Sequence, residues 1–527
     1  MWSQEDDLRK PLLDPSSGLP YDYQQKRGGS GKYSKEDDST TGKARPTSRS
    51  CNDILFGILF LLVVIGMAVI SGIAYSRGQP GQLVPSNTFI NGHNSTVIVD
   101  GLQDAVAQMR QNKDVLIYSV LVAFTVAALW MELLKRFTRF FIYLTMCLGV
   151  ALVIIVGIFF MFLGHKESSE ATMIVGGCTI ILGLLLVGVV VYLRRSIDLT
   201  CAMFTETCRG VQRSPSVFVT GIVVILFFIG FLAYWTSSFV YLFSIPGHNI
   251  HWSGSSSDSN ELPHFDDKIR NLMFYMVFAF LWVTAYISAV FQSVVAGAVS
   301  HWYFARGSAN SEVGSSNAFV SLGRAMTTSL GSLALGSLVI AFIEFFAFML
   351  RLAKKSNAEN KLAVMLLSCI QCILGCVEGI VRWVNKFGYI YVAMHGYSFC
   401  TATKACFDLI QRNMFTAVIM DFIGSFVLLL GKIMVTAGTA LFASVVLYCT
   451  DRSIKANVIT IGLAALFAFC ISNIFTHIIG IGTDTIFVCY LEDVENNGTA
   501  NLLISPDLHE LLQAKCDEHK KKDQESN

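Results

Sequence analysis

The chain has 527 residues, of which 53% are hydrophobic and only 15% are charged, whereas soluble domains carry about 25% charged residues. This balance excludes a string of ordinary soluble domains and indicates a polytopic membrane protein. The formal net charge of +1 lacks the basic excess of a nucleic-acid-binding protein, so we expect the lipid bilayer and no nucleic acid as a partner.

Three regions follow one another along the chain. Residues 1–50 are rich in Ser, Gly, Asp and Lys, which predicts a disordered cytosolic tail. Residues 51–491 hold all the long apolar segments and are expected to form the transmembrane domain. Residues 492–527 are expected to form a cytosolic C-terminal tail. No cleavage site precedes the first apolar segment, so we expect that segment to act as the insertion signal.

The apolar segments predict an all-α fold of ten transmembrane helices, because about 20 apolar residues cross a bilayer core of about 30 Å. In chain order the predicted spans are 54–75, 115–134, 140–163, 171–193, 217–240, 271–295, 332–350, 362–381, 424–448 and 458–488. An even number of spans places both tails on one side of the membrane.

Three segments are predicted to include amphipathic stretches on the cytosolic surface. Met414–Leu447 would be about 51 Å long as one helix, which exceeds a single straight crossing, so part of it should lie along the interface or tilt. Ser321–Leu350 is also long and carries a polar stripe near its start. Arg194–Gln212 alternates charged and apolar residues as a surface helix does.

The side of the membrane is assigned from two features. The Lys and Arg distribution favours both tails inside the cell. The sequence Asn94-Ser95-Thr96 is a glycosylation acceptor, and this topology places it outside. We therefore expect a glycoprotein of the plasma membrane, with an organelle membrane as the alternative. Neither feature sets an oligomeric state.

The predicted tenth span contains Asp484 among apolar residues. A central charge costs roughly 2.5–3.5 kcal/mol on insertion scales, so it needs a partner or water. Lys432 of the ninth span lies at a similar depth, and we expect Lys432 and Asp484 to form an ion pair. The pair would act either as an inner gate or proton-coupled switch, or as a static contact that sets helix register. A heptad of glycines beside Lys432, namely Gly424, Gly431 and Gly438, predicts a close helix contact.

Several polar or glycine-bearing blocks resemble the choline transporter-like family. They are RSCNDILFGILFLLVVIGMAVISG (49–72), AGAVSHWYF (296–304), GRAMTTSLGSLALGSLVIAFIE (323–344), FGYIYVAMHGYSFCTATKACFDLIQRN (387–413), GKIMVTAGTA (431–440) and DTIFVCYLEDVENNGT (484–499). The resemblance spans about residues 49–512 and implies ten spans, cytosolic tails and transport of choline or a related amine. This chain departs from many animal members in its short first outer loop without cysteine, and in Glu344, where glutamine is expected.

Choline suggests which residues would bind it, because its trimethylammonium group has no N–H donor and is held by aromatic faces and carboxylates. Tyr275, Phe278, Trp282 and Tyr286 share one face of the sixth predicted span and are candidates for one wall of such a site. The alternative is an aromatic stripe packed on lipid or on another helix. Glu344 of the seventh span either attracts the cation or faces interfacial water.

The leading functional prediction is therefore facilitated or secondary transport of choline or a related organic cation through an aromatic-lined cavity. The alternatives are a non-transporting scaffold or receptor with the same fold, and a transporter of another small solute or lipid. No Walker A, nucleophile-elbow or His-Glu-x-x-His motif occurs, so we expect no enzyme, cofactor or metal site.

Overall fold

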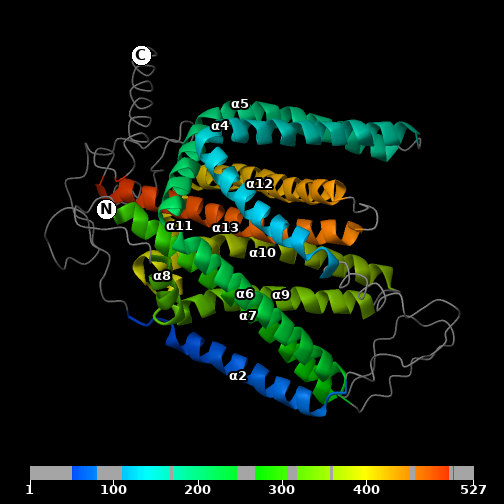
Figure 1. Ribbon diagram of the computed structural model, residues 1–527, viewed down its shortest axis with the longest axis vertical. Helices are drawn as coiled ribbons and strands as arrows, with labels where there is room; N and C mark the ends of the chain where they lie inside the picture. Colours follow the sequence, from blue (N-terminus) through cyan, green and yellow to red (C-terminus); the bar gives the residue numbers. More distant parts are fainter. Residues whose placement is uncertain are drawn as a thin grey trace.

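The computed structural model describes residues 50–79, 110–166, 170–245, 267–305, 317–356, 360–450, 457–497 and 503. Within these residues every regular element is a helix, and no strand occurs (Figure 1). The helices are α2 (Ile54–Arg77), α4 (Lys113–Lys166), α5 (Glu170–Arg213), α6 (Ser216–Phe243), α7 (Asp267–Ala305), α8 (Asn317–Met326), α9 (Leu330–Ser356), α10 (Lys361–His395), α11 (Phe399–Gln411), α12 (Met414–Cys449) and α13 (Val458–Asn497). The predicted glycosylation site Asn94 and most of both predicted tails lie outside the described residues.

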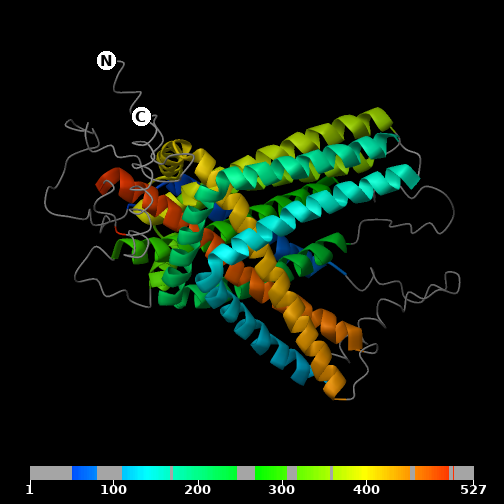
Figure 2. The ribbon, with the colours of Figure 1, turned by 90° about the horizontal axis from the view of Figure 1, so that it is seen from above.

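Nine helices among the described residues are long and apolar enough to cross a membrane. Ten spans were predicted, and the difference lies in α4, which contains two of them. At Phe137 the backbone leaves helical geometry (φ −121°, ψ 29°), and the helix bends sharply there (Figure 2). The predicted spans 115–134 and 140–163 fall on the two arms of this bend. The chain is thus an all-α, multi-pass membrane protein.

The helices converge at one end of the molecule and diverge toward the other (Figure 2). We call the convergent end the tail side, because α2 begins and α13 ends there (Figure 1). Burial along α13 follows the same pattern. Every residue from Ile481 to Leu491 is buried, whereas many residues between Val458 and Cys470 are exposed or half-buried. The bundle is therefore tightly packed around the C-terminal half of α13.

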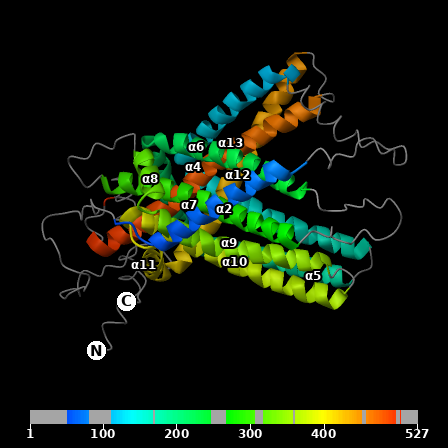
Figure 3. The same cartoon turned by 90° about the horizontal axis from the view of Figure 1, so that it is seen from below.

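The tail side also carries the short helices α8 and α11 (Figure 3). The predicted segment Ser321–Leu350 is divided between α8 and α9 by a turn at residues 327–329. Arg194–Gln212 is the continuation of α5 instead of a separate helix. Met414–Leu447 is one continuous helix within α12.

Two of the three glycines predicted to form a close seam on α12 do so. A Cβ at Gly431 would lie 2.3 Å from the Trp130 indole nitrogen, and one at Gly424 would lie 3.0 Å from the Phe204 ring. A Cβ at Gly438 would meet nothing within 4 Å. The seam therefore accommodates large aromatic side chains of α4 and α5.

Candidate functional site

A row of charged side chains on α10 is the most unusual polar feature of the bundle. Glu378, Arg382 and Lys386 follow one another at intervals of four residues, which places them on one face of the helix. Charges inside a membrane-spanning helix normally face the protein interior or water, and they find partners there. We call these three residues and their ion-pair partners the α10 charge row.

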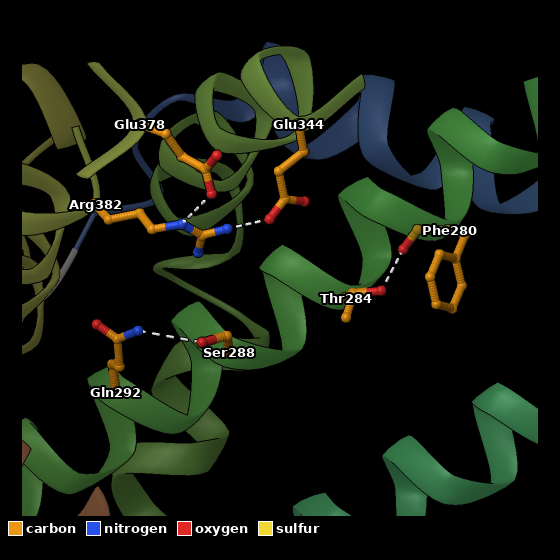
Figure 4. Close-up of polar contacts among 7 residues, drawn as sticks. All are labelled: Phe280, Thr284, Ser288, Gln292, Glu344, Glu378 and Arg382. Carbon is orange, nitrogen blue, oxygen red and sulfur yellow. Dashed lines mark hydrogen bonds and ion pairs between the residues drawn. The ribbon is translucent and has the colours of Figure 1, made fainter. Parts of the chain in front are cut away.

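The first half of the row joins α10 to α9. The Arg382 guanidinium contacts Glu344 of α9, and its Nε lies 2.9 Å from Glu378 Oε1 (Figure 4). The side chains of Glu344 and Glu378 are 25% and 28% exposed, so neither carboxylate is fully buried. One guanidinium is thus shared by two partly accessible carboxylates.

A polar stripe on α7 lies beside this group. Thr284, Ser288 and Gln292 are spaced four residues apart, and the Gln292 amide donates to Ser288 Oγ at 3.2 Å (Figure 4). Ser288 is exposed, although its neighbours from Ala285 to Ile287 and at Ala289 and Val290 are buried. Polar side chains of α7, α9 and α10 therefore gather in one part of the bundle.

The second half of the row joins α10 to α12 and α13. Lys386 Nζ lies 2.9 Å from Asp421 Oδ1 of α12 and 2.9 Å from Asp484 Oδ2 of α13. The Asp484 side chain is 10% exposed and the Lys386 side chain 18%, whereas that of Asp421 is 41% exposed. The Lys386 ammonium also lies 4.9 Å from the centroid of the Phe387 ring.

This geometry corrects the expected ion pair between Lys432 and Asp484. Asp484 does have a lysine partner, but that partner is Lys386. The prediction paired α12 with α13 because they are consecutive, and it ended the preceding span at residue 381. In the structure α10 continues to His395, since its charges are neutralised by neighbouring helices. The spacing of Glu378, Arg382 and Lys386 was the signal that could have revealed this.

The whole row carries two positive and four negative side chains when every group is ionised. Two carboxylates share each cation. The surplus of negative charge lies within membrane-spanning helices, where electrostatic interactions are screened less than in water. Such an arrangement favours positively charged solutes nearby and disfavours anions.

The four predicted aromatic residues of α7 pack against α2 and α9. The Tyr275 hydroxyl donates to the Val63 carbonyl at 2.9 Å, and Trp282 Nε1 donates to the Ala334 carbonyl at 3.2 Å. The Phe60 ring of α2 lies 5.4 Å from that of Trp282 and 4.3 Å from that of Tyr286, measured between centroids.

The outer end of this stripe approaches the helix segment that carries Glu344. The Phe278 ring lies 5.2 Å from that of Phe342 and 5.5 Å from that of Phe345, both on α9. Trp282 and Tyr286 are buried. The Tyr286 hydroxyl has no hydrogen-bond partner among the described residues. Trp282 and Tyr286 therefore face protein, whereas Tyr275 and Phe278 are half-buried, and the role of the stripe as a binding wall stays a prediction.

Comparison with known protein sequences gives a consistent set of relatives. A family model described as plasma-membrane choline transporter matches residues 177–495. A CTL-like protein of Dictyostelium discoideum is 60% identical over 548 residues, covering 100% of this chain and 99% of the relative. Choline transporter-like protein 2 of the same organism is 28% identical over 72% of this chain and 63% of its own length. Choline transporter-like protein 5 of Xenopus tropicalis is 32% identical over 45% of this chain and 35% of its own length.

Proposed function

Because the chain belongs to the choline transporter-like family, we propose that it carries choline or a related small organic cation across a membrane. The relative with 60% identity is named only as CTL-like, so the proposed substrate is argued from the residues of the site. We propose the plasma membrane as the location, with an organelle membrane as the alternative.

The α10 charge row is the observation that carries this proposal. It holds twice as many carboxylates as cationic groups, and it contacts α9, α12 and α13, which are long and apolar enough to cross a membrane. A structural ion pair needs only one partner of each sign, whereas a path for a cation benefits from excess negative charge. Glu344 and Glu378 are both partly exposed, and they would attract the solute.

The aromatic stripe on α7 supplies the complementary chemistry in this proposal. Indole and phenol faces attract a quaternary ammonium group through the ring quadrupole. Phe278 lies nearest the part of α9 that carries Glu344, and the stripe continues to Trp282 and Tyr286. The solute would move between the carboxylates and these rings as the helices rock.

Uptake of radiolabelled choline into proteoliposomes tests the proposal. We expect saturable uptake that Glu344→Gln reduces by about tenfold. That reduction corresponds to about a third of the ~4 kcal/mol by which a carboxylate attracts a cation at 4 Å for an effective dielectric of 20. Glu132→Gln is the matched control, since Glu132 forms its ion pairs with Lys135 and Arg136 on the same helix, outside the row.

A non-transporting scaffold or receptor predicts a different outcome. It would show no saturable flux, and Glu344→Gln would behave like Glu132→Gln. Trp282→Ala separates the two parts of the site. It should raise the choline concentration for half-maximal uptake if the aromatic wall binds substrate, and leave it unchanged if the stripe only packs helices together.

A further inference from the structure

Three of the sequence blocks that resemble the family meet at one point on the tail side, and the residues that join them are not members of the α10 charge row. The three blocks are the start of α2, the start of α9 and the turn between α10 and α11. The residues that join them are Asn52, Asp53, Ser332, Gly396 and Phe399, which we call the tail-side latch.

Asp53 is the centre of the latch. Its Oδ2 accepts hydrogen bonds from Ser332 Oγ at 2.7 Å and from the Phe399 backbone N–H at 2.8 Å. Asn52 Nδ2 donates to the Gly396 carbonyl at 2.7 Å. Among the described residues, Asp53 is the one non-glycine residue with positive φ (55°). An aspartate tolerates that conformation better than most residues, but it persists only where surrounding contacts hold it.

The Asp53 side chain caps a helix other than its own. By position Asp53 is the N-cap of α2, yet it makes no capping bond there. Ser398 occupies the N-cap position of α11 and makes no capping bond either. The carboxylate of Asp53 instead binds the first N–H of α11, where it satisfies an orphan donor and faces the positive end of the helix dipole.

The backbones at the latch are in close contact. A Cβ at Gly331 would lie 2.3 Å from the Asp53 carbonyl oxygen, so no larger residue fits between α2 and α9 there. Gly396, in the left-handed conformation (φ 73°), ends α10 and turns the chain into α11. The latch is therefore a built contact among four helices and not a chance encounter of surface side chains.

The opposite end of α11 is tied to α13. Arg412, the residue after α11, lies 2.9 Å from Glu495, and His395 at the end of α10 lies 3.1 Å from Glu492. Helix α11 is thus fastened to α2 and α9 at its start and to α13 at its end. It crosses the tail side next to the C-terminal half of α13, in which residues 481–491 are buried (Figure 3).

We propose that the tail-side latch holds α11 as a crossbar that keeps the tail side of the bundle shut, and that its release opens that side. This inference rests on the proposed transport function, because only a transporter needs the convergent end to open. Breaking Asp53 from Ser332 and Phe399 removes the hydrogen bonds that join α2 to α9 and to the start of α11, and it leaves the ion pairs of the α10 charge row in place.

Native cysteines report the position of α11 directly. Cys406 on α11 is fully buried, whereas Cys400 on the same helix is exposed. Burial raises the pKa of the Cys406 thiol well above its ordinary value, which suppresses the reactive thiolate. Cys208 on α5 is equally buried, and burial raises its pKa to about 12, so it serves as a control outside the crossbar.

The test compares labelling rates of full-length protein in nanodiscs with a hydrophilic maleimide, measured for each cysteine by mass spectrometry. In Asp53→Gly, which keeps the positive φ and removes the carboxylate, Cys406 should label about two- to thirtyfold faster, the range expected for loss of a helix cap. Ser332→Ala removes one bond and should give a smaller increase. Cys208 should be unchanged in both variants.

Ser398→Ala is the matched control, because Ser398 holds the N-cap position without making a capping bond and, among the described residues, its hydroxyl bonds only to the Thr401 hydroxyl of the same helix. It should leave Cys406 labelling unchanged. The proposal is overturned if Asp53→Gly leaves Cys406 protected, or if Cys406 and Cys208 become reactive together, which would indicate general loosening. Labelling needs no substrate, so the expected labelling pattern without choline flux would refute the transport function and leave the latch in place.

Discussion

Lys386 should be the single most sensitive charged residue of the spanning region. It is the one cation within reach of both Asp421 and Asp484 among the described ion pairs. The Lys386→Met substitution keeps most of the side-chain volume but leaves two carboxylates without their counter-charge. The protein can then only protonate them, hydrate them or rearrange.

The two contacts of Lys386 are expected to differ in strength because their burial differs. Removing one partner of a buried ion pair costs about 3–5 kcal/mol. With 10% of its side chain exposed, Asp484 belongs to that class, so we expect a coupling energy with Lys386 of about 2–3 kcal/mol. Asp421 is 41% exposed, and exposed ion pairs contribute little, so its coupling with Lys386 should be below about 1 kcal/mol.

Double-mutant cycles on the free energy of unfolding, measured by denaturing detergent titration in mixed micelles, give these couplings. Lys386→Met alone should destabilise by about 3–5 kcal/mol, and Asp484→Asn should cost about 2–3 kcal/mol less in the Lys386→Met background than in the wild-type protein. The control cycle pairs Asp484→Asn with Lys432→Met, which should be additive within about 0.5 kcal/mol. Coupling at Lys432 with additivity at Lys386 would refute the assignment and restore the pairing first expected from the sequence.

Three further predictions concern packing, a hydrogen bond and topology. Gly336→Ala should destabilise by about 1–3 kcal/mol in the same assay, because its Cβ would lie 2.6 Å from aromatic rings of α10 and α11. A Cβ at Gly375 meets nothing within 4 Å, so Gly375→Ala should not destabilise the protein. Trp282→Phe should cost about 1 kcal/mol through loss of the bond to the Ala334 carbonyl, and an unchanged unfolding free energy would contradict that bond. Asn94→Gln should abolish an endoglycosidase-sensitive mobility shift in eukaryotic cells, and a wild-type protein without any shift would contradict the outside placement of that loop.

The helical, membrane-spanning architecture could be predicted because hydropathy is a local property. Each apolar run reports its own burial in lipid or protein, and the helix starts at Ile54 and Val458 fall where the runs begin. The positions where the helices end were harder to predict. The predicted span 362–381 stopped just before Arg382, whereas α10 continues through Arg382 and Lys386. Hydropathy along the sequence does not reveal that a charge is neutralised by a residue distant in the chain.

The ion-pair partner of Asp484 was predicted wrongly for the same reason. The sequence indicates that Asp484 needs a counter-charge, but both α10 and α12 carry a lysine, and which one is near depends on how the helices pack. Helix capping likewise depends on contacts that the local sequence does not reveal. A local rule assigns Ser398 as the N-cap of α11, whereas the structure uses Asp53, 346 residues away from the N–H that it binds. The aromatic face of α7 was predictable from spacing, and its neighbours on α2 and α9 were not.

The α10 charge row also has a consequence for biosynthesis. Lys386 leaves the ribosome 98 residues before Asp484, its most buried partner. At about 5–20 residues per second, that interval lasts about 5–20 s. During this time the Lys386 ammonium lacks its most buried partner, and it can be neutralised only by the more exposed Asp421 once that residue has been made. Nascent chains halted before residue 484 should therefore remain crosslinkable to the insertion machinery at α10, and release should coincide with the emergence of α13.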